Sequence, residues 1–324
     1  MPPSIPQNRF QPGSTIALDV LQGLSRRPRR LPSKYFYDAE GDRLFQQIMH
    51  MPEYYLTDCE YEILETKKEA IFKAIGSRKF SLLELGAGDG LKTRVLLRYF
   101  LEQGADFQYQ PIDISRNVLL ELEESLKAEL PALQVKSMEG DYFEVLHELQ
   151  PKAGVPKVVL FLGANIGNYS QQEALRFLRS LARGLAPGDL LLIGFDLKKN
   201  PGIILDAYND PAGITAAFNL NLLRRLNREL GANFDLQQFR HWESYNPLSG
   251  EARSYIVSQR DQHVFIRQLN RSFHFEAWEA IEVELSLKYS LSEVEALAEA
   301  AGFVRQQHFF DKKNYFVDSL WRMP

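Results

Sequence analysis

The sequence predicts an α/β fold with a mostly parallel sheet and a second region inserted into it. From Phe80 to Asp196, strand-like apolar runs alternate with amphipathic helical runs, as a parallel sheet requires. After Asp196 this alternation stops, and it resumes near Ser292. The chain has 324 residues, 45% of them apolar. This length and composition predict about two domains with complete cores.

The elements of the sheet region follow in a regular order. Strands are expected at Phe80–Leu85, Gln108–Ile114, Leu133–Met138, Lys157–Gly163 and Leu190–Phe195, and helices at Leu91–Leu101, Arg116–Glu129 and Gln171–Leu185. A long helical segment over roughly Gly202–Leu230 and a strand-containing lobe over Phe234–Tyr289 come next. The chain then returns to the sheet with a helix at Ser292–Ala301, Gly302 as its C-cap, and strands at Phe303–Phe310 and Tyr315–Trp321, the last inserted antiparallel.

Before the sheet region, residues 14–75 have helical periodicity, clearest from Asp58 to Ile75. The basic cluster at residues 26–30 is expected to be a solvated segment before the first ordered element rather than a binding patch. We therefore divide the chain into an N-terminal segment (1–30), helices that belong with the inserted lobe (31–78), a sheet domain (79–196 and 290–324) and the inserted lobe (197–289).

Composition excludes several classes of function. The net charge is −4 with the two signs interspersed, so we expect neither nucleic-acid nor membrane binding. No stretch is long and apolar enough for a membrane span, and Met1–Pro12 lacks the apolar core of a signal peptide. The single cysteine, Cys59, excludes an internal disulfide and is interpreted as structural. The histidines form no metal-ligand cluster. We expect a cytoplasmic protein with a small-molecule substrate; the sequence leaves its oligomeric state open.

A glycine-rich loop is the most informative part of the chain. Gly86, Gly88 and Gly90 follow the first expected strand and its terminal Glu84, and a helix comes directly after them. Glycines let a backbone approach a ligand closely, and a helix N-terminus offers free N–H groups. Asp113 ends the next expected strand, where a carboxylate suits the two hydroxyls of a ribose. An adenosine-containing cofactor is expected.

The spacing in this loop discriminates between cofactors. A dinucleotide site has the pattern G-x-G-x-x-G, whereas this loop reads G-x-G-x-G followed by Leu91 and Lys92. Glu84 would repel a pyrophosphate but would suit a cation. S-adenosylmethionine (SAM) has no phosphate and carries a sulfonium and an α-ammonium, so SAM is favoured. A nicotinamide or flavin dinucleotide, and a fold without a cofactor, remain alternatives.

The sequence offers candidate residues for binding SAM and for binding the methyl acceptor. In the SAM hypothesis, Gly86 and Gly88 pass beneath the methionine portion and Lys92 reaches its carboxylate. Asp141 accepts from the adenine amino group, and its neighbour Tyr142 packs on the ring. The loop at residues 163–169 follows the fourth expected strand, where a methyl acceptor would be held. Its asparagines and glycines equally suit simple turn chemistry.

Several sequence blocks occur in an order that resembles a known family. The blocks are Lys34–Asp38, Gly41, Leu44–Phe45, Pro52–Tyr55, Glu84–Lys92, Gly163, Ile166–Asn168, Ala207–Asp210 and Gly213–Asn219. From about residue 31 onward they resemble the histidine Nα-methyltransferases of ergothioneine biosynthesis. The resemblance implies a SAM-dependent methyltransferase fold, with a Rossmann-like seven-stranded sheet and an appended acceptor-binding lobe. It also implies three successive methylations of the α-amino group of L-histidine, giving hercynine.

The resemblance also implies roles for individual residues. By position, Asn168 and Tyr208 hold the α-carboxylate of the acceptor, Tyr54 faces the imidazole, Glu284 and Ser286 bond the imidazole nitrogens, and Tyr37 lies by the amino group. Tyr37 and Asn168 are the expected catalytic residues. The donor contacts are Gly86, Lys92, Asp113, Asp141 and Tyr142.

The chemistry of the reaction agrees with an aromatic acceptor site. The attacking amine must be neutral, so a nearby carboxylate or phenol has to accept its proton. The trimethylated product is a permanent cation, which Phe36, Tyr37 and Tyr54 would attract by about 0.5–2 kcal/mol per ring. The same aromatic residues also suit core packing. Other open hypotheses are another amino acid or a modified histidine as acceptor, a SAM-binding protein without turnover, and a dehydrogenase.

Overall fold

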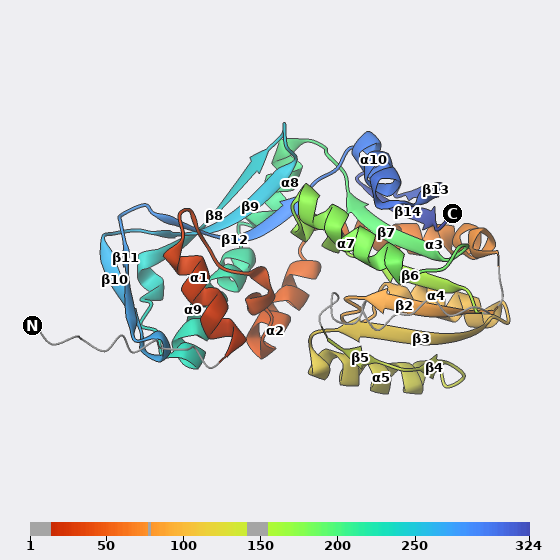
Figure 1. Cartoon of the computed structure of the whole chain (residues 1–324), viewed down its shortest axis with the longest axis horizontal. Helices are drawn as coiled ribbons and strands as arrows, with labels where there is room; N and C mark the ends of the chain where they lie inside the picture. The colour runs from red at the N-terminus through yellow and green to blue at the C-terminus, as the bar shows by residue number, and fades with distance from the viewer. Residues whose placement is uncertain (1–13, 77–78, 141–154) are drawn as a thin grey trace, which may run out of the picture. The chain divides into compact units, whose positions relative to one another are not determined.

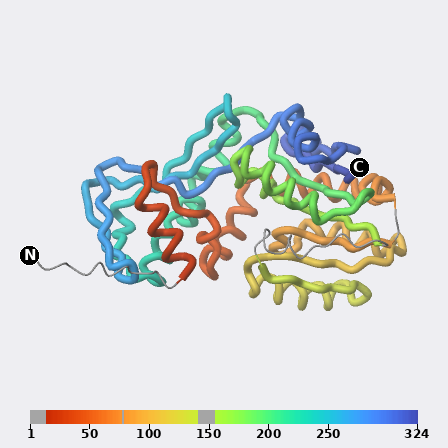
Figure 2. The backbone as a smooth tube through the Cα atoms, viewed as in Figure 1, coloured from red at the N-terminus to blue at the C-terminus, as the bar shows by residue number. Residues whose placement is uncertain are grey.

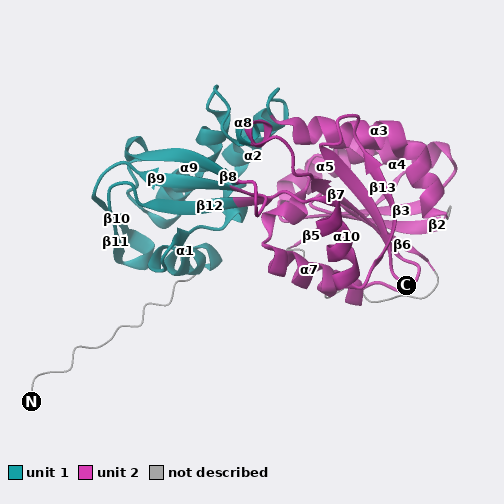
Figure 3. Cartoon of the chain, turned by 90° about the horizontal axis from the view of Figure 1, so that it is seen from above, with its two compact units in different colours: residues 1–53, 205–245, 253–284 teal, residues 54–204, 246–252, 285–324 magenta. Residues whose placement is uncertain are grey.

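A computed structural model describes residues 14–76, 79–140 and 155–324 of the chain (Figure 1). Two compact units make up the fold (Figure 3). Unit 1 comprises Met1–Glu53, Leu205–Tyr245 and Arg253–Glu284, and unit 2 comprises Tyr54–Ile204, Asn246–Ala252 and Leu285–Pro324. Each unit is therefore assembled from three separate stretches of chain.

Unit 2 contains the sheet that the sequence predicts. Its described elements are α3 (Tyr55–Ile75), β2 (Lys79–Leu85), α4 (Thr93–Glu102), β3 (Asp106–Asp113), α5 (Arg116–Glu129), β4 (Gln134–Val135), β5 (Met138–Glu139), β6 (Lys157–Phe161), the 3₁₀ helix η2 (Asn165–Asn168), α7 (Gln171–Arg183), β7 (Leu190–Asp196), α10 (Leu291–Ala301), β13 (Val304–Phe310) and β14 (Phe316–Arg322). The strand order is β13-β14-β7-β6-β2-β3-β4, with β5 pairing on the same edge of β3 as β4 does. The predicted α/β fold with seven strand positions is confirmed.

The pairing of these strands places the end of the chain inside the sheet. β2, β3, β6 and β7 run parallel, and β14 pairs antiparallel with both β7 and β13. Figure 2 shows this blue C-terminal segment beside the green segment of β7. The predicted antiparallel insertion of the last strand is confirmed. Strands that are buried on both faces read as continuous apolar runs, as in residues 158–161 of β6.

The core of unit 2 lies between the sheet and its helices. On one face, Phe177 and Leu181 of α7 and Val294 of α10 pack on Phe161 and Phe195 of the sheet, all without exposed surface. Burying each such side chain contributes about 1.5–3 kcal/mol. α7 and α10 both start with a serine capping box, which explains the sharp start of each helix.

Unit 1 combines helices with two small sheets. Its described elements are α1 (Thr15–Ser25), β1 (Arg29–Arg30), η1 (Ser33–Phe36), α2 (Ala39–Met49), α9 (Ile214–Leu230), η3 (Leu236–Gln238), β10 (Gln262–Ile266), η4 (Arg267–Leu269) and β11 (Arg271–Phe275), together with parts of α8 (Pro201–Tyr208), β8 (Phe239–Asn246), β9 (Glu251–Ser258) and β12 (Ala280–Leu287), which the unit boundaries divide. The sheets have the orders β1-β12-β9-β8 and β10-β11. The expected strand-containing lobe is confirmed.

Two expectations about this part of the chain are wrong. The basic cluster is not a solvated segment before the first ordered element: α1 precedes it, and Arg29 in β1 is 3% exposed. The Arg29 guanidinium bonds Glu279 at 2.7 Å and lies 4.3 Å from the ring centre of Phe275. The helical segment after β7 is two helices: α8 ends at Tyr208, and α9 starts after Gly213, where the Asp210 carboxylate accepts from the N–H groups of Ile214 and Thr215.

Cys59 is buried within α3, as expected for a structural residue. Burial raises the pKa of its thiol to about 12. In the described part of the chain, no helix meets the length and hydropathy of a membrane span.

Candidate functional site

The glycine-rich loop lies between β2 and α4, at the carboxyl end of the parallel strands. Gly86, Gly88 and Gly90 have φ of +73°, +54° and +66°, values that favour glycine over residues with a side chain. The Gly88 N–H donates to Oδ2 of Asp113 over 3.1 Å. The structure thus brings together two predicted cofactor residues, one from the loop after β2 and one from the end of β3.

Asp113 is fixed at the end of β3 by backbone donors. Its Oδ1 accepts from the N–H of Ser115 at 2.9 Å, and Ser115 in turn caps α5. Burial raises the pKa of Asp113, and the hydrogen bonds from Ser115 and Gly88 oppose that rise. A Cβ built on Gly88 would meet no atom within 4 Å, so the backbone is open there. A carboxylate beside an open glycine backbone fits a ribose and the chain attached to it.

Glu84 has a structural role rather than the ligand-binding role that its position in the sequence suggests. Its charge and position suit a cationic ligand, but its side chain is buried and accepts hydrogen bonds from the hydroxyls of Thr93 and Tyr109. Thr93 opens α4 and Tyr109 lies in β3, so Glu84 ties together the two elements beside the glycine loop. Burial raises the pKa of Glu84 to about 7, despite the two hydroxyl donors.

Lys92 belongs to a second buried cluster in unit 2. Its ammonium forms an ion pair with Glu60 of α3, which has no exposed surface. Glu60 also accepts from the N–H of Gly163, at 2.7 and 2.9 Å. Burial, then the neighbouring Glu60, raises the pKa of Asp318 well above its ordinary value. Sequence reasoning missed Glu60 and Asp318, because nothing in their local sequence links residues so far apart.

The loop after β6 contains Asn168 and approaches β12 closely. Gly163 and Ala164 have φ of +76° and +53°, and η2 follows them. A Cβ on Gly167 would lie 2.8 Å from the carbonyl oxygen of Leu287, so the two backbones are in contact. Asn168, which is exposed, and Ser286, which precedes Leu287, are therefore next to contacting residues. The structure brings these two predicted acceptor residues into one neighbourhood.

Ser286 is connected to a buried charge network in unit 2. The Lys288 Nζ lies 2.8 Å from Ser286 Oγ and 2.8 Å from Asp196 Oδ2. Asp196 also pairs with Lys199 and accepts from the Tyr55 hydroxyl at 2.8 Å. Burial acts to raise the pKa of Asp196, but Lys288 and Lys199 outweigh it and leave the pKa below its ordinary value. The alternation Glu284, Ser286, Lys288 was the signal in the sequence that places Lys288 on the same strand face.

In unit 1, Tyr37 lies in an aromatic cluster. Its ring is 5.7 Å from that of Phe45 and 5.8 Å from that of Phe218, both edge-on. Arg225 of α9 donates to the Tyr37 carbonyl at 2.9 Å. Tyr37 is 37% exposed, whereas Phe36 is 1% exposed. Phe36 is thus a core residue, and Tyr37 has the accessible ring.

Tyr208 and Glu284 also lie in unit 1. Tyr208 ends α8, and its carbonyl oxygen lies 3.0 Å from His241 Nε2. Glu284 is half-buried in β12, where its Oε2 is 3.2 Å from the Ser254 hydroxyl. That hydroxyl also bonds Glu243 at 2.7 Å, so two carboxylates share one serine. Glu284 therefore belongs to a buried polar face rather than a solvated one.

The remaining predicted residues are placed as follows. Tyr54 is partly buried and directly precedes α3 in unit 2. Asp141 and Tyr142, the predicted adenine contacts, lie outside the described residues. No group of three or more His, Cys, Asp or Glu side chains in the described ranges is arranged to hold a metal ion.

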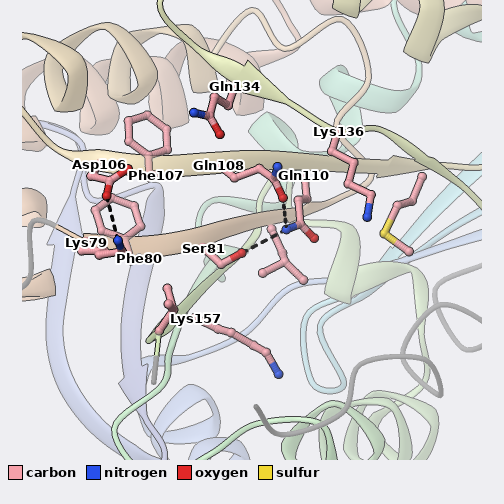
Figure 4. Close-up of a pocket in the computed structure, with 13 residues that line it drawn as sticks. Lys79, Phe80, Ser81, Asp106, Phe107, Gln108, Gln110, Gln134, Lys136 and Lys157 are labelled. Carbon is pink, nitrogen blue, oxygen red and sulfur yellow. Dashed lines mark hydrogen bonds and ion pairs between the residues drawn. The ribbon is translucent and has the colours of Figure 1, made fainter. Parts of the chain in front are cut away.

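Unit 2 also has a pocket, and none of the predicted site residues lines it (Figure 4). Its lining includes Lys79, Asp106 and Lys157, which are the first residues of β2, β3 and β6. It therefore lies at the amino ends of the strands, whereas the glycine loop and Asp113 lie at the carboxyl ends. In doubly wound sheets, ligands bind at the carboxyl ends.

The sequence of the chain is similar to those of known proteins. A family model described as "Histidine-specific methyltransferase, SAM-dependent" matches residues 16–323. A histidine N-alpha-methyltransferase of Mycolicibacterium smegmatis is 39% identical over 292 residues, which is 90% of this chain and 89% of that protein. One from Mycobacterium tuberculosis is 36% identical, with 93% of both chains covered. Ergothioneine biosynthesis protein 1 of Neurospora crassa is 33% identical over 85% of this chain and 31% of its own length.

Proposed function

Because the chain belongs to the histidine-specific, SAM-dependent methyltransferase family, we propose that it methylates the α-amino nitrogen of L-histidine, up to three times, to give hercynine. The observation that carries this proposal is the family match over residues 16–323, which includes the glycine loop and the acceptor residues. The ergothioneine protein among the relatives supports a place in ergothioneine biosynthesis.

The residues at the carboxyl ends of β2 and β3 suit SAM. Asp113 would bond the ribose hydroxyls, and Gly86 and Gly88 would lie beneath the methionine portion, where the Gly88 backbone is open. Lys92 is 20% exposed at its side chain and would present its ammonium to the methionine carboxylate. When bound, SAM supplies an electrophilic methyl group on a sulfonium.

The chain's own residues would orient the acceptor. Asn168 and Tyr208 would hold the α-carboxylate of histidine, and Tyr54, Glu284 and Ser286 would hold its imidazole. Holding the amine in line with the methyl group supplies much of the acceleration, because the reaction then needs no further ordering.

Tyr37 would lie by the amino group. The ammonium must lose a proton before the amine attacks, and the Tyr37 hydroxyl would relay that proton by accepting it while passing its own proton to water. The accessible ring of Tyr37 would also attract the methylated product, by about 0.5–2 kcal/mol.

Glu284 and Ser286 would provide the preference for histidine. An acceptor with an apolar side chain would form no hydrogen bond with either group, and sites built to bond a polar acceptor reject such analogues strongly.

Mass spectrometry of the purified protein with SAM and an equimolar mixture of the twenty amino acids tests the proposal. The expected result is a gain of one to three methyl groups on histidine alone, and loss of that preference in Glu284→Ala. Methylation of a different amino acid would contradict the proposed acceptor. SAM binding without any methylation would contradict turnover itself.

A further inference from the structure

A buried network next to Ser286 has no part in the proposed function so far. Lys288 has no exposed surface and Asp196 has 1% exposed. Charges are costly to bury unless they are paired, and here Asp196 pairs with both Lys288 and Lys199. The two lysines differ in the hydroxyl that each contacts. Lys288 Nζ donates to the Ser286 hydroxyl at 2.8 Å, whereas Lys199 Nζ lies 2.9 Å from the Tyr55 hydroxyl.

The chemistry of this contact sets the direction of the hydrogen bond. An ammonium has three N–H donors and no acceptor, whereas a hydroxyl can do either. In the contact with Lys288, the Ser286 oxygen therefore accepts, and its O–H points away from Lys288. The Asp196 carboxylate stabilises the positive charge of Lys288 and holds the ammonium at this place.

We propose that Lys288 is a positioning residue that commits the Ser286 hydroxyl to donate its hydrogen bond, so that the site selects an acceptor side chain with a nitrogen lone pair. This inference rests on the proposed function, in which Ser286 and Glu284 hold the imidazole. A neutral imidazole has one lone-pair nitrogen for Ser286 and one N–H for the Glu284 carboxylate. A protonated imidazole, or an aromatic ring with only C–H groups, offers Ser286 nothing to bond.

Steady-state kinetics of Lys288→Met tests the proposal. The variant keeps the length of the side chain and removes the donor, so Lys288 no longer makes the Ser286 oxygen an acceptor. The KM for L-histidine should rise about three- to tenfold, because the hydroxyl can then turn away from the imidazole and is no longer polarised by a charged donor. The kcat and the KM for SAM should change by less than about twofold. A double-mutant cycle with Ser286→Ala gives a readout that a structural role would not move. In the Ser286→Ala background, Lys288→Met should change the histidine KM by less than about twofold.

Lys199→Met is the matched control, because Lys199 pairs with the same carboxylate. It should lower the unfolding temperature about as much as Lys288→Met does, with the histidine KM changed less than about twofold. If Lys288→Met does not fold, Lys288→Gln keeps an N–H donor for Asp196. Its amide carbonyl can accept from Ser286, so the hydroxyl is no longer committed. The histidine KM should then rise at least about threefold.

The outcomes separate this inference from the proposed function. If the wild-type protein methylates histidine but the two substitutions act additively on KM, Lys288 does not act through Ser286 and the inference is wrong. An unchanged histidine KM in Lys288→Met or Lys288→Gln also overturns it. If the wild-type protein methylates no histidine, the proposed function fails on its own, and the inference fails with it.

Discussion

Replacing Glu84 by glutamine should flatten the pH dependence of stability. Glu84 is 3% exposed, and the raised pKa of about 7 means that the folded protein resists the loss of its proton. A carboxyl group with a raised pKa contributes its full stability below the unfolded value of 4.5, and that contribution is lost as the pH rises through about 7. Glutamine has nearly the same shape, can bond the hydroxyls of Thr93 and Tyr109, and does not titrate.

The size of the effect follows from the two pKa values. Raising a carboxyl pKa from 4.5 to about 7 costs the folded state about 3 kcal/mol once the group is ionised. Part of this cost is already present at pH 5. Between pH 5 and pH 8.5 the wild-type protein should therefore lose about 2.5 kcal/mol relative to Glu84→Gln.

Urea unfolding at the two pH values measures this difference. Trp321 is fully buried in β14, so its fluorescence reports on unit 2. Other groups that titrate in this range are present in both proteins, and subtracting one free energy of unfolding from the other removes them. A difference that is the same at pH 5 and pH 8.5 would refute the reasoning, because Glu84 would then have an ordinary pKa in the folded protein.

Three further substitutions test the SAM site and unit 1. Asp113→Asn should weaken SAM binding by about 1.5–3 kcal/mol, as measured by calorimetry, since it removes a charged acceptor for the ribose; unchanged affinity would contradict that role. Gly88→Ala should cost about 1–2 kcal/mol of unfolding free energy because φ is +54°, and should weaken SAM binding at least about tenfold. If its affinity is unchanged, SAM does not lie against this backbone. Asp38→Ala should lower the stability of unit 1 by about 2 kcal/mol in urea unfolding, because Asp38 caps α2 and bonds Asn221 and Arg228; a loss below about 0.5 kcal/mol would show that these contacts contribute little.

The sheet of unit 2 was predictable because its signals are local. The helix expected at Arg116–Glu129 has those bounds in the structure, since Ser115 caps its start and its apolar residues recur on one face. Asp210, Pro211 and Gly213 are local signals for the break after Tyr208, but the apolar periodicity on both sides favours one continuous helical segment.

Other features depend on contacts between distant residues. The composition of the basic cluster predicts a solvated segment. Arg29 is nevertheless buried, because Glu279 and Phe275, about 250 residues further along the chain, contact its guanidinium. Similarly, Glu60 and Lys92 form a pair that no spacing in the sequence indicates. Single-residue chemistry cannot identify such partners, because the fold brings them together.

The candidate site was partly predictable. The glycine loop and Asp113 were found from their position after strands, and the structure joins them by a hydrogen bond. Glu84 was chosen for its charge, but its burial and two hydroxyl partners were not visible in the sequence. Lys288 could have been found, since it continues the polar alternation of Glu284 and Ser286.

The position of β14 has a consequence for synthesis on the ribosome. β14 pairs with β7 on one side and β13 on the other, so the sheet has a gap until Phe316–Arg322 have been made. Until then β7 presents an unpaired edge, of the kind that promotes association with other chains. Asp318 reaches its buried place beside Glu60 with the same strand. The strands β2, β3 and β6 can therefore pair before residues 316–322 are made, while completion of the sheet waits for those residues.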